Sequence, residues 1–276
     1  PAGLYVSSIE ASHHDARTAY VTIDGHRSDD FRPYVLVTRD LGQSWNVLSA
    51  GLPDDAPAQV VREGLINPSL LFAGTEFGIW ASVDQGAHWA KFGEGLPTVA
   101  VDDIAIHPRE HDLVIATHGR SLWVMDDITP LEHWTSRSTS DSVTFFPPRG
   151  ALAFYTLGIG GVWGHRMFRA KNPPFGAYFD YYLGQDVDDG VSIAVQDSAG
   201  LALRTLHGPG TKGFHRVTWD LQAGEPKDRI GRPEWGDQPL YVAPGRYKAT
   251  LTAGSAAPIQ RTLDVRHAPG IADEER

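Results

Sequence analysis

The chain has 276 residues and a hydrophobic content of 41%, which is typical of a globular protein with a substantial core. Its 34 acidic and 24 basic residues give a formal net charge of −10 without a basic stripe, which excludes nucleic acid as the expected partner. It has no cysteine and no run approaching roughly 18 apolar residues, which excludes disulfides, zinc–thiolate sites, thiol nucleophiles and a membrane span.

Two short motifs repeat each other in the first third of the chain. The segments "TRDLGQSW" and "SVDQGAHW" both read [S/T]-x-D-x-G-x-x-W, and their tryptophans, at 45 and 89, are 44 residues apart. That period is the size of a four-stranded propeller blade. The motif residues are Thr38, Asp40, Gly42 and Trp45 in the first copy and Ser82, Asp84, Gly86 and Trp89 in the second.

A second repeated layout supports the same period. An Ile, a short polar turn and an apolar run ending in Thr recur at 9–22, 66–75 and 106–117. Short apolar runs bounded by Gly, Pro and Asp are typical of strands, so the sequence predicts an all-β arrangement of about three four-stranded blades over 1–135. The predicted strands lie near 4–10, 18–24, 33–38 and 45–49, then 58–65, 70–76, 78–83 and 89–93, then 101–107, 113–118, 121–126 and 131–135.

The repeated motif falls between the third and fourth predicted strands of a blade. We expect its Asp to accept hydrogen bonds from backbone amides of the turn, its Gly to adopt positive φ, and its Trp to pack back over the hairpin. We therefore interpret Asp40 and Asp84 as structural, because a catalytic carboxylate is usually needed only once.

The second half predicts another β domain. The stretch 136–176 is rich in Ser, Thr, Gly and Pro and is predicted to be a linker and a long loop. Six or seven short strand patterns follow over 177–267, which favours a β-sandwich. The polar, acidic stretch 268–276 is predicted to be a tail.

The two motifs resemble the Asp-box, or bacterial neuraminidase repeat. The stretches "AYVTIDGHRSDDFRPYVLVTRDLGQSW" and "DLVIATHGRSLWVMDD" resemble more narrowly the bacterial sortilin-like propeller proteins, which are often labelled glycosyl hydrolase. "GFHRVTWDL" and "VAPGRYKATLTAG" resemble the immunoglobulin-like domain of flagellar hook-cap type. Because such propellers close with about six or more blades, the resemblance implies that the remaining blades come from a missing N-terminal segment or from another subunit.

The turns between the second and third strands of each blade carry the candidate site residues. Propeller topology places these turns on one face, where carboxylates, His and Arg can bind a sugar, a carboxylate ligand or a cation, or simply pair with one another in solvent. The candidate ligand-binding residues are Asp24, His26, Arg27, Glu76, His118 and Arg120. Glycoside hydrolysis needs two carboxylates, and the candidate catalytic pair is Asp29 or Asp30 with Glu76.

Every specific motif therefore has a structural interpretation, and the favoured function is a non-catalytic propeller scaffold or binding module for a protein or glycan ligand. We expect it to be exported, although the chain shows no signal-peptide pattern. The alternative is a glycoside hydrolase, exo-sialidase- or xyloglucanase-like, whose active site is completed by the missing blades. No cofactor is expected, and the histidine-containing turns at 12–15 and 107–112 are too irregular to predict a metal site.

Overall fold

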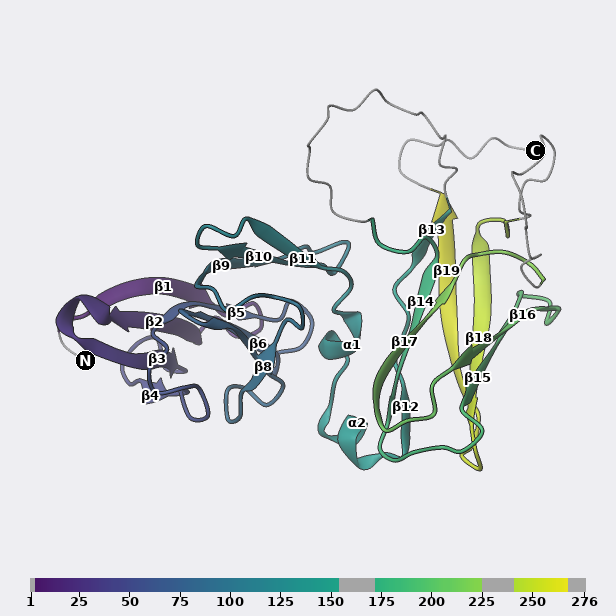
Figure 1. Cartoon of the computed structure of the whole chain (residues 1–276), viewed down its shortest axis with the longest axis horizontal. Helices are drawn as coiled ribbons and strands as arrows, with labels where there is room; N and C mark the ends of the chain where they lie inside the picture. Colours follow the sequence, from purple (N-terminus) through teal and green to yellow (C-terminus); the bar gives the residue numbers. More distant parts are fainter. Residues whose placement is uncertain (1–2, 154–171, 225–240, 268–276) are drawn as a thin grey trace, which may run out of the picture. The chain divides into compact units, whose positions relative to one another are not determined.

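The computed structural model describes residues 3–153, 172–224 and 241–267, and it divides the chain into two compact units, Pro1–Thr135 and Ser136–Arg276. Each unit is built almost wholly from β-strands (Figure 1). Within the described residues, no helix is long and apolar enough to span a membrane. The predicted tail, 268–276, lies outside the described residues.

The first unit contains three antiparallel sheets in chain order, which we call blades one to three (Figure 1). In each blade the strands are hydrogen-bonded in the order in which they follow one another along the chain. The strands are β1 (Tyr5–Ala11), β2 (Ala19–Gly25), β3 (Asp30–Thr38) and β4 (Asn46–Val47) in blade one, β5 (Ala58–Glu63), β6 (Leu71–Thr75), β7 (Gly78–Ser82) and β8 (Ala90–Phe92) in blade two, and β9 (Val101–Ile106), β10 (Leu113–Thr117) and β11 (Leu122–Met125) in blade three. A short 3-10 helix, η1 (His26–Ser28), lies between β2 and β3.

Blade three lacks the predicted fourth strand at 131–135, where the structure has the helix α1 (Thr129–Glu132). The prediction was wrong for two local reasons. The repeated motif [S/T]-x-D-x-G-x-x-W, which we call the Asp-turn, has no copy after β11, so no such turn brings the chain back to pair with that strand. Pro130, the residue before the predicted strand, lies in the first turn of α1, where its fixed φ favours the start of a helix.

The three blades pack face to face through two apolar seams. Side chains alternate between the two faces of a strand, so blade two presents one face to blade one and the other to blade three. The seam between blades one and two contains Tyr20, Val35, Val37, Val61, Leu71, Ala73 and Trp89. The seam between blades two and three contains Val60, Phe72, Ile79, Ala81, Val101, Ile104, Leu113 and Ile115.

The second unit is a β-sandwich of two sheets. One sheet has the order β12-β14-β17 and the other β13-β19-β18-β15-β16, with all pairs antiparallel except β13 with β19. The elements are α2 (Ser136–Ser140), β12 (Val143–Phe145), β13 (Ala151–Ala153), β14 (Ala177–Leu183), β15 (Val191–Gln196), β16 (Ala202–Gly208), β17 (Gly213–Trp219), β18 (Gly245–Ala253) and β19 (Ile259–His267). The short strands β12 and β13 and the helix α2 lie inside 136–176, the stretch that the sequence suggests is a linker and loop.

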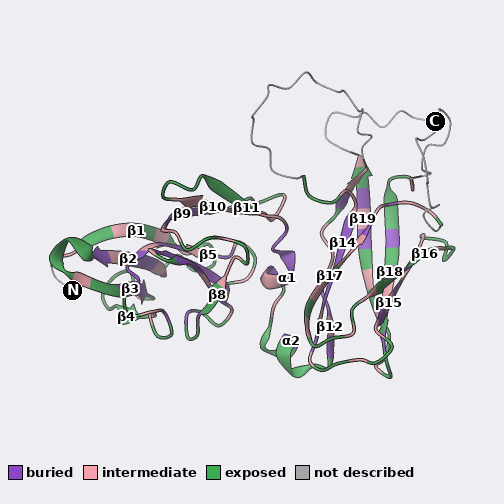
Figure 2. Cartoon of the chain, viewed as in Figure 1, coloured by how far each residue is buried: buried purple, intermediate pink, exposed green. Residues whose placement is uncertain are grey.

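One apolar core fills the space between the two sheets of the sandwich. Phe179 on β14 and Trp219 on β17 belong to the first sheet, and Ile193 and Leu251 belong to the second; all four are at most 1% exposed. Burial alternates along β18, as expected for a strand with one face on a core and one in solvent (Figure 2). This core gives the second unit its own source of stability.

Tyr181, at the centre of β14, should make the sandwich sensitive to alkaline pH. Its ring is fully buried, its hydroxyl donates to the carbonyl of Pro209 at 2.6 Å, and burial raises its pKa to about 12. A raised pKa means that the folded state holds the proton more tightly, so the stability it contributes is present below pH 10 and is lost as the pH rises through 12.

We expect Tyr181→Phe to lower the free energy of unfolding by about 1 kcal/mol at neutral pH, because one hydrogen bond is lost. Above pH 10 the free energy of unfolding of the variant should fall less steeply with pH, because the group with the raised pKa is gone. Urea denaturation of the variant and of the control Tyr182→Phe, at neutral and alkaline pH, measures both effects. An unchanged alkaline slope in Tyr181→Phe would contradict this assignment.

Candidate functional site

The repeated Asp-turns have the same hydrogen-bond network in both copies. In the first, the Thr38 hydroxyl donates to Asp40 Oδ1 at 2.8 Å and accepts from the amide of Gly42 at 2.8 Å. Asp40 Oδ1 also accepts from the amide of Ser44 at 2.9 Å. Gly42 has φ +85°, which favours glycine. In the second copy the corresponding bonds join Ser82, Asp84, Gly86 and His88.

These bonds determine what the turn carboxylates can do. Hydrogen bonds from the side chain and amide of Ser44, and from Thr38, lower the pKa of Asp40 to about 2. A carboxylate that is ionised throughout the neutral range and faces its own turn has no proton to donate as a general acid. The geometry fits a role in holding the turn between the third and fourth strands.

The two motif tryptophans differ in their surroundings. Trp89 is 8% exposed, and its indole N–H donates to the carbonyl of Leu48 at 2.6 Å, which ties blade two to the end of blade one. Trp45 is 41% exposed. It lies over its own turn, since a Cβ on Gly42 would be 4.0 Å from the Trp45 ring.

The candidate ligand-binding residues form separate pairs, one in each blade. In blade one, the buried carboxylate of Asp24 lies 2.5 Å from Nδ1 of His26 and also accepts the His26 amide. In blade two, Glu76 Oε1 accepts from Gln59 Nε2 at 2.9 Å. In blade three, Nδ1 of His118 lies 3.2 Å from Asp102 Oδ2.

The two candidate arginines are placed differently. The guanidinium of Arg27 lies 5.7 Å from the centre of the Tyr5 ring, in cation–π range. Arg120 lies in the exposed turn before β11, where its carbonyl accepts from the indole of Trp123 at 3.0 Å. Both therefore lie in the turns between second and third strands, but the structure gives neither a contact with the carboxylates of another blade.

The candidate catalytic carboxylates are in separate environments. Arg32 and the Tyr34 hydroxyl hold Asp30, with Arg32 Nη2 2.7 Å and the tyrosine oxygen 2.8 Å from Asp30 Oδ2. The hydrogen bond from Arg32, then that from Tyr34, lowers the pKa of Asp30 far below its usual range. Asp29 ends η1 in the left-handed conformation, with φ 57°. Glu76 belongs to blade two and is engaged by Gln59.

Sequence reasoning missed three polar residues that lie beside these turns. Ser7, Gln59 and Asp102 each fall at a register break in the first strand of their blade, where one residue of that strand has no partner on the second strand. In sequence each break appears only as a polar residue that interrupts an otherwise alternating strand.

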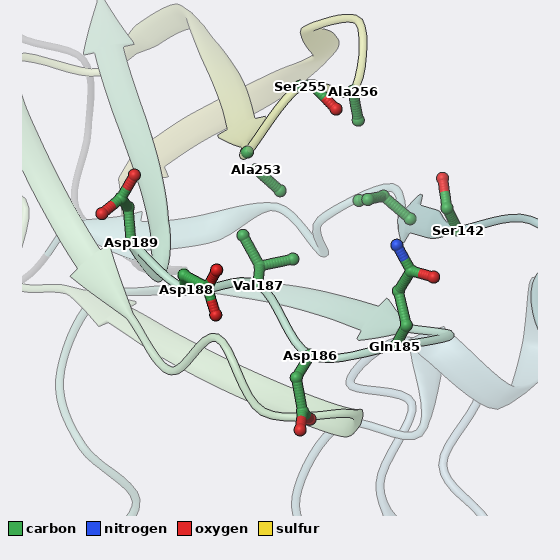
Figure 3. A pocket seen from close by; sticks show the side chains of 11 residues that line it. Ser142, Gln185, Asp186, Val187, Asp188, Asp189, Ala253, Ser255 and Ala256 are labelled. Atoms are coloured by element: carbon green, nitrogen blue, oxygen red, sulfur yellow. The ribbon is translucent and has the colours of Figure 1, made fainter.

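The second unit has a shallow hollow of about 280 Å³ (Figure 3). The turn between β14 and β15 supplies Asp186, Asp188 and Asp189, which are exposed and point in different directions (Figure 3). Asp186 already accepts the amide of Lys212 at 2.6 Å. Within the described residues, no group of three or more His, Asp or Glu side chains is arranged to hold a metal ion.

No protein-family model matches the chain, and no curated protein matches it in sequence. Solved structures of β-propeller type resemble it at low TM-score. An ancestral GH74 enzyme gives a TM-score of 0.36 at 14% identity over 94% of this chain and 31% of its own. The GH74 xyloglucanase from Xanthomonas campestris gives a TM-score of 0.37 at 13% identity, and the match covers 89% of this chain and 35% of the xyloglucanase. YCF48 bound to D1 peptide gives a TM-score of 0.31 at 13% identity, and the match covers 94% of this chain and 66% of YCF48. The chain thus spans about a third of the length of the two GH74 proteins.

Proposed function

We propose that this chain is a non-catalytic β-propeller module of the Asp-box, sortilin-like type, followed along the chain by an immunoglobulin-like sandwich. Its two end blades receive further blades, either from adjoining parts of a longer chain or from another subunit, and the completed propeller binds a protein or glycan. The observation that carries the proposal is the exposure of the apolar side chains Ile9, Leu122 and Val124 on the two end faces, whose equivalents are buried wherever another blade adjoins that face.

The first end face belongs to blade one. Ile9 is 69% exposed, whereas the equivalent residues Val61 in blade two and Ile104 in blade three are 0% and 1% exposed. The three are equivalent because each lies two residues after the register break in its first strand. Val47 on β4 shares the face with Ile9 and is 64% exposed.

The second end face belongs to blade three. Leu122 is 66% exposed, whereas its equivalents Val35 and Ile79 are both 0% exposed against the blade that follows them. Val124, two residues further along β11, is 56% exposed where its equivalent Ala81 is 9% exposed. Contiguous apolar exposure of this kind marks an interaction surface in soluble proteins.

Trp45 supports the same proposal from a different direction. Its equivalent, Trp89, reaches back to a carbonyl of the preceding blade. Trp45 is the first copy of the motif, and its greater exposure is what a missing preceding blade would leave. The fixed roles of Asp30, Asp40 and Asp84 in their own turns support the absence of catalysis.

The test is the association state of the 276-residue chain. We expect sedimentation velocity to show concentration-dependent self-association, because both end faces are exposed, and we expect Leu122→Glu with Val124→Glu to reduce it at least tenfold in affinity. Leu201→Glu is the matched control, since Leu201 is 64% exposed on the other unit and belongs to no apolar face that lacks a blade.

Two results would overturn the proposal. One is a monomer at every concentration whose behaviour the paired glutamates do not change. The other is turnover of chromogenic glycosides that disappears in Glu76→Gln, which would favour the glycoside hydrolase.

A further inference from the structure

The first strands of all three blades contain a β-bulge at the same place. The pairing skips Ser7 on β1, Gln59 on β5 and Asp102 on β9. A bulge leaves one residue outside the ladder and redirects its side chain, and bulges are common beside binding sites. Three bulges at one repeated position, each occupied by a polar residue, indicate that the blades share this redirected side chain.

The bulges also lie next to one another across the seams. The hydroxyls of Ser7 and Thr22 in blade one donate to the carbonyls of Ala58 and Gln59 at 3.1 Å each. In the next seam the position of Thr22 is occupied by Gly74, where a Cβ would lie 2.8 Å from the carbonyl oxygen of Val101, the residue before the third bulge. The three bulges therefore form a continuous row along one end of the first strands.

Two of the redirected side chains hold residues of the turns between second and third strands. Gln59 holds Glu76, and Asp102 holds His118. The turn of blade one has its own pair, Asp24 with His26, whose imidazole is 45% exposed. Each blade thus presents one oriented pair of planar polar groups at the same end of the module.

Exposed aromatic rings flank this row. Tyr5, two residues before the first bulge, is 61% exposed, and Phe77, next to Glu76, is 42% exposed. Sugar hydroxyls both donate and accept hydrogen bonds, so they match carboxylate–imidazole and carboxylate–carboxamide pairs, and the apolar face of a sugar ring packs on aromatic rings. The carboxylates of Asp24, Glu76 and Asp102 share this end of the module with Arg27 and Arg120, so it carries no positive excess that would attract an anionic sugar.

We propose that this row is a binding surface for neutral glycans, in which Gln59, Asp102, His26, Glu76 and His118 face the ligand, while Ser7 and the buried Asp24 hold the first bulge and His26 in place. It rests on the proposed function, since it names the ligand class that the module binds. Neutral oligosaccharides lie along the row, with one sugar ring against Phe77 or against the face of Tyr5 that Arg27 leaves open, and with hydroxyls on the polar pairs.

The experiment is isothermal titration calorimetry of the chain with cellohexaose, mannohexaose and, as the anionic comparison, sialyllactose. We expect at least one neutral hexasaccharide to bind and sialyllactose not to bind. Gln59→Ala with Asp102→Ala should weaken the neutral ligand at least tenfold. The control, Gln260→Ala with Asp264→Ala, changes the same two residue types on the second unit and should leave the affinity unchanged. Circular dichroism verifies that both variants fold.

Three outcomes overturn this inference: no binding of either hexasaccharide, binding of sialyllactose alone, or neutral binding that the bulge variant leaves intact. None of these outcomes affects the association test, because self-association depends on the apolar end faces and not on the bulge residues. Self-association without glycan binding would therefore reject the glycan surface and leave the proposed module standing, whereas a monomeric chain would reject the module itself.

Discussion

Replacing His111 by asparagine is expected to lower the free energy of unfolding of the first unit by about 3 kcal/mol, because the change strands a buried carboxylate. The side chain of Glu132 on α1 is completely buried, and its Oε2 lies 2.8 Å from Nδ1 of His111. Asparagine is chosen because His111 has φ 56°, a conformation that asparagine tolerates. Urea denaturation followed by tryptophan fluorescence measures the loss.

The loss should depend on pH. Burial raises the pKa of Glu132 above its ordinary value of 4.5, while the charges of His111 and His133 oppose the rise and that of Asp127 adds to it. A raised pKa gives stability that is present at low pH and lost as the pH rises, so His111→Asn should cost least below pH 4.5 and most at neutral pH. Adding Glu132→Gln should recover most of the loss at neutral pH. An equal loss at both pH values would show that the ion pair is not its cause.

Replacing Glu63 by alanine is expected to cost about 3 kcal/mol and to loosen blade one from blade two. The Glu63 carboxylate, 2% exposed at the end of β5, accepts from the hydroxyl of Ser12, the amide of His13 at 2.6 Å and the hydroxyl of Tyr20 at 3.0 Å. All three donors belong to blade one, and each is left without its acceptor in the variant. Of the three donors only Tyr20 is buried, and a buried donor without its partner costs about 1–3 kcal/mol, whereas Ser12 and His13 are more exposed and can bond to water instead.

Hydrogen exchange locates this effect. Amides of β1 and β2 should exchange faster in Glu63→Ala, while those of β9 and β10, beyond the second seam, should keep their protection. The control is Glu76→Ala, which removes a partly exposed carboxylate with a single bond from Gln59 and should cost under about 1 kcal/mol. Uniform loss of protection over all three blades would contradict a local role at the first seam.

The blades could be predicted from sequence because the turns that define them are held by hydrogen bonds between residues close together in the chain. The bonds from Asp40 stay within four residues of chain, so the same letters reproduce the same turn in the second copy. The fourth strand of blade three was predicted from the repeat, but the turn motif has no copy after β11 and the chain begins a helix there, with Pro130 in its first turn. The strands β12 and β13 span three residues each, too few for alternation to stand out from a loop.

The candidate site could be predicted only in part, for the same physical reason. Asp24 and His26 lie two residues apart, so a single turn brings them together. The partners of Glu76 and His118 come from bulges 17 and 16 residues earlier in the chain. A bulge is a property of how two strands pair, and a single strand's sequence shows it only as a break in alternation.

The helix α1, which replaces the last strand of blade three, also determines which bonds of the first unit would bear a mechanical force applied from the C-terminal side. Asn67, in the turn between β5 and β6, donates its side-chain amide to the carbonyls of Leu131 and Trp134 at 3.3 and 3.0 Å. The amide of Ile128 donates to the carbonyl of His111, in the turn before β10. A pull from the C-terminal side therefore meets anchors on blades two and three before it reaches β11. The bonds from Asn67 on blade two take the load first and the bond from Ile128 to His111 takes it second, so the pairs between β10 and β11 are loaded only after both anchors have opened.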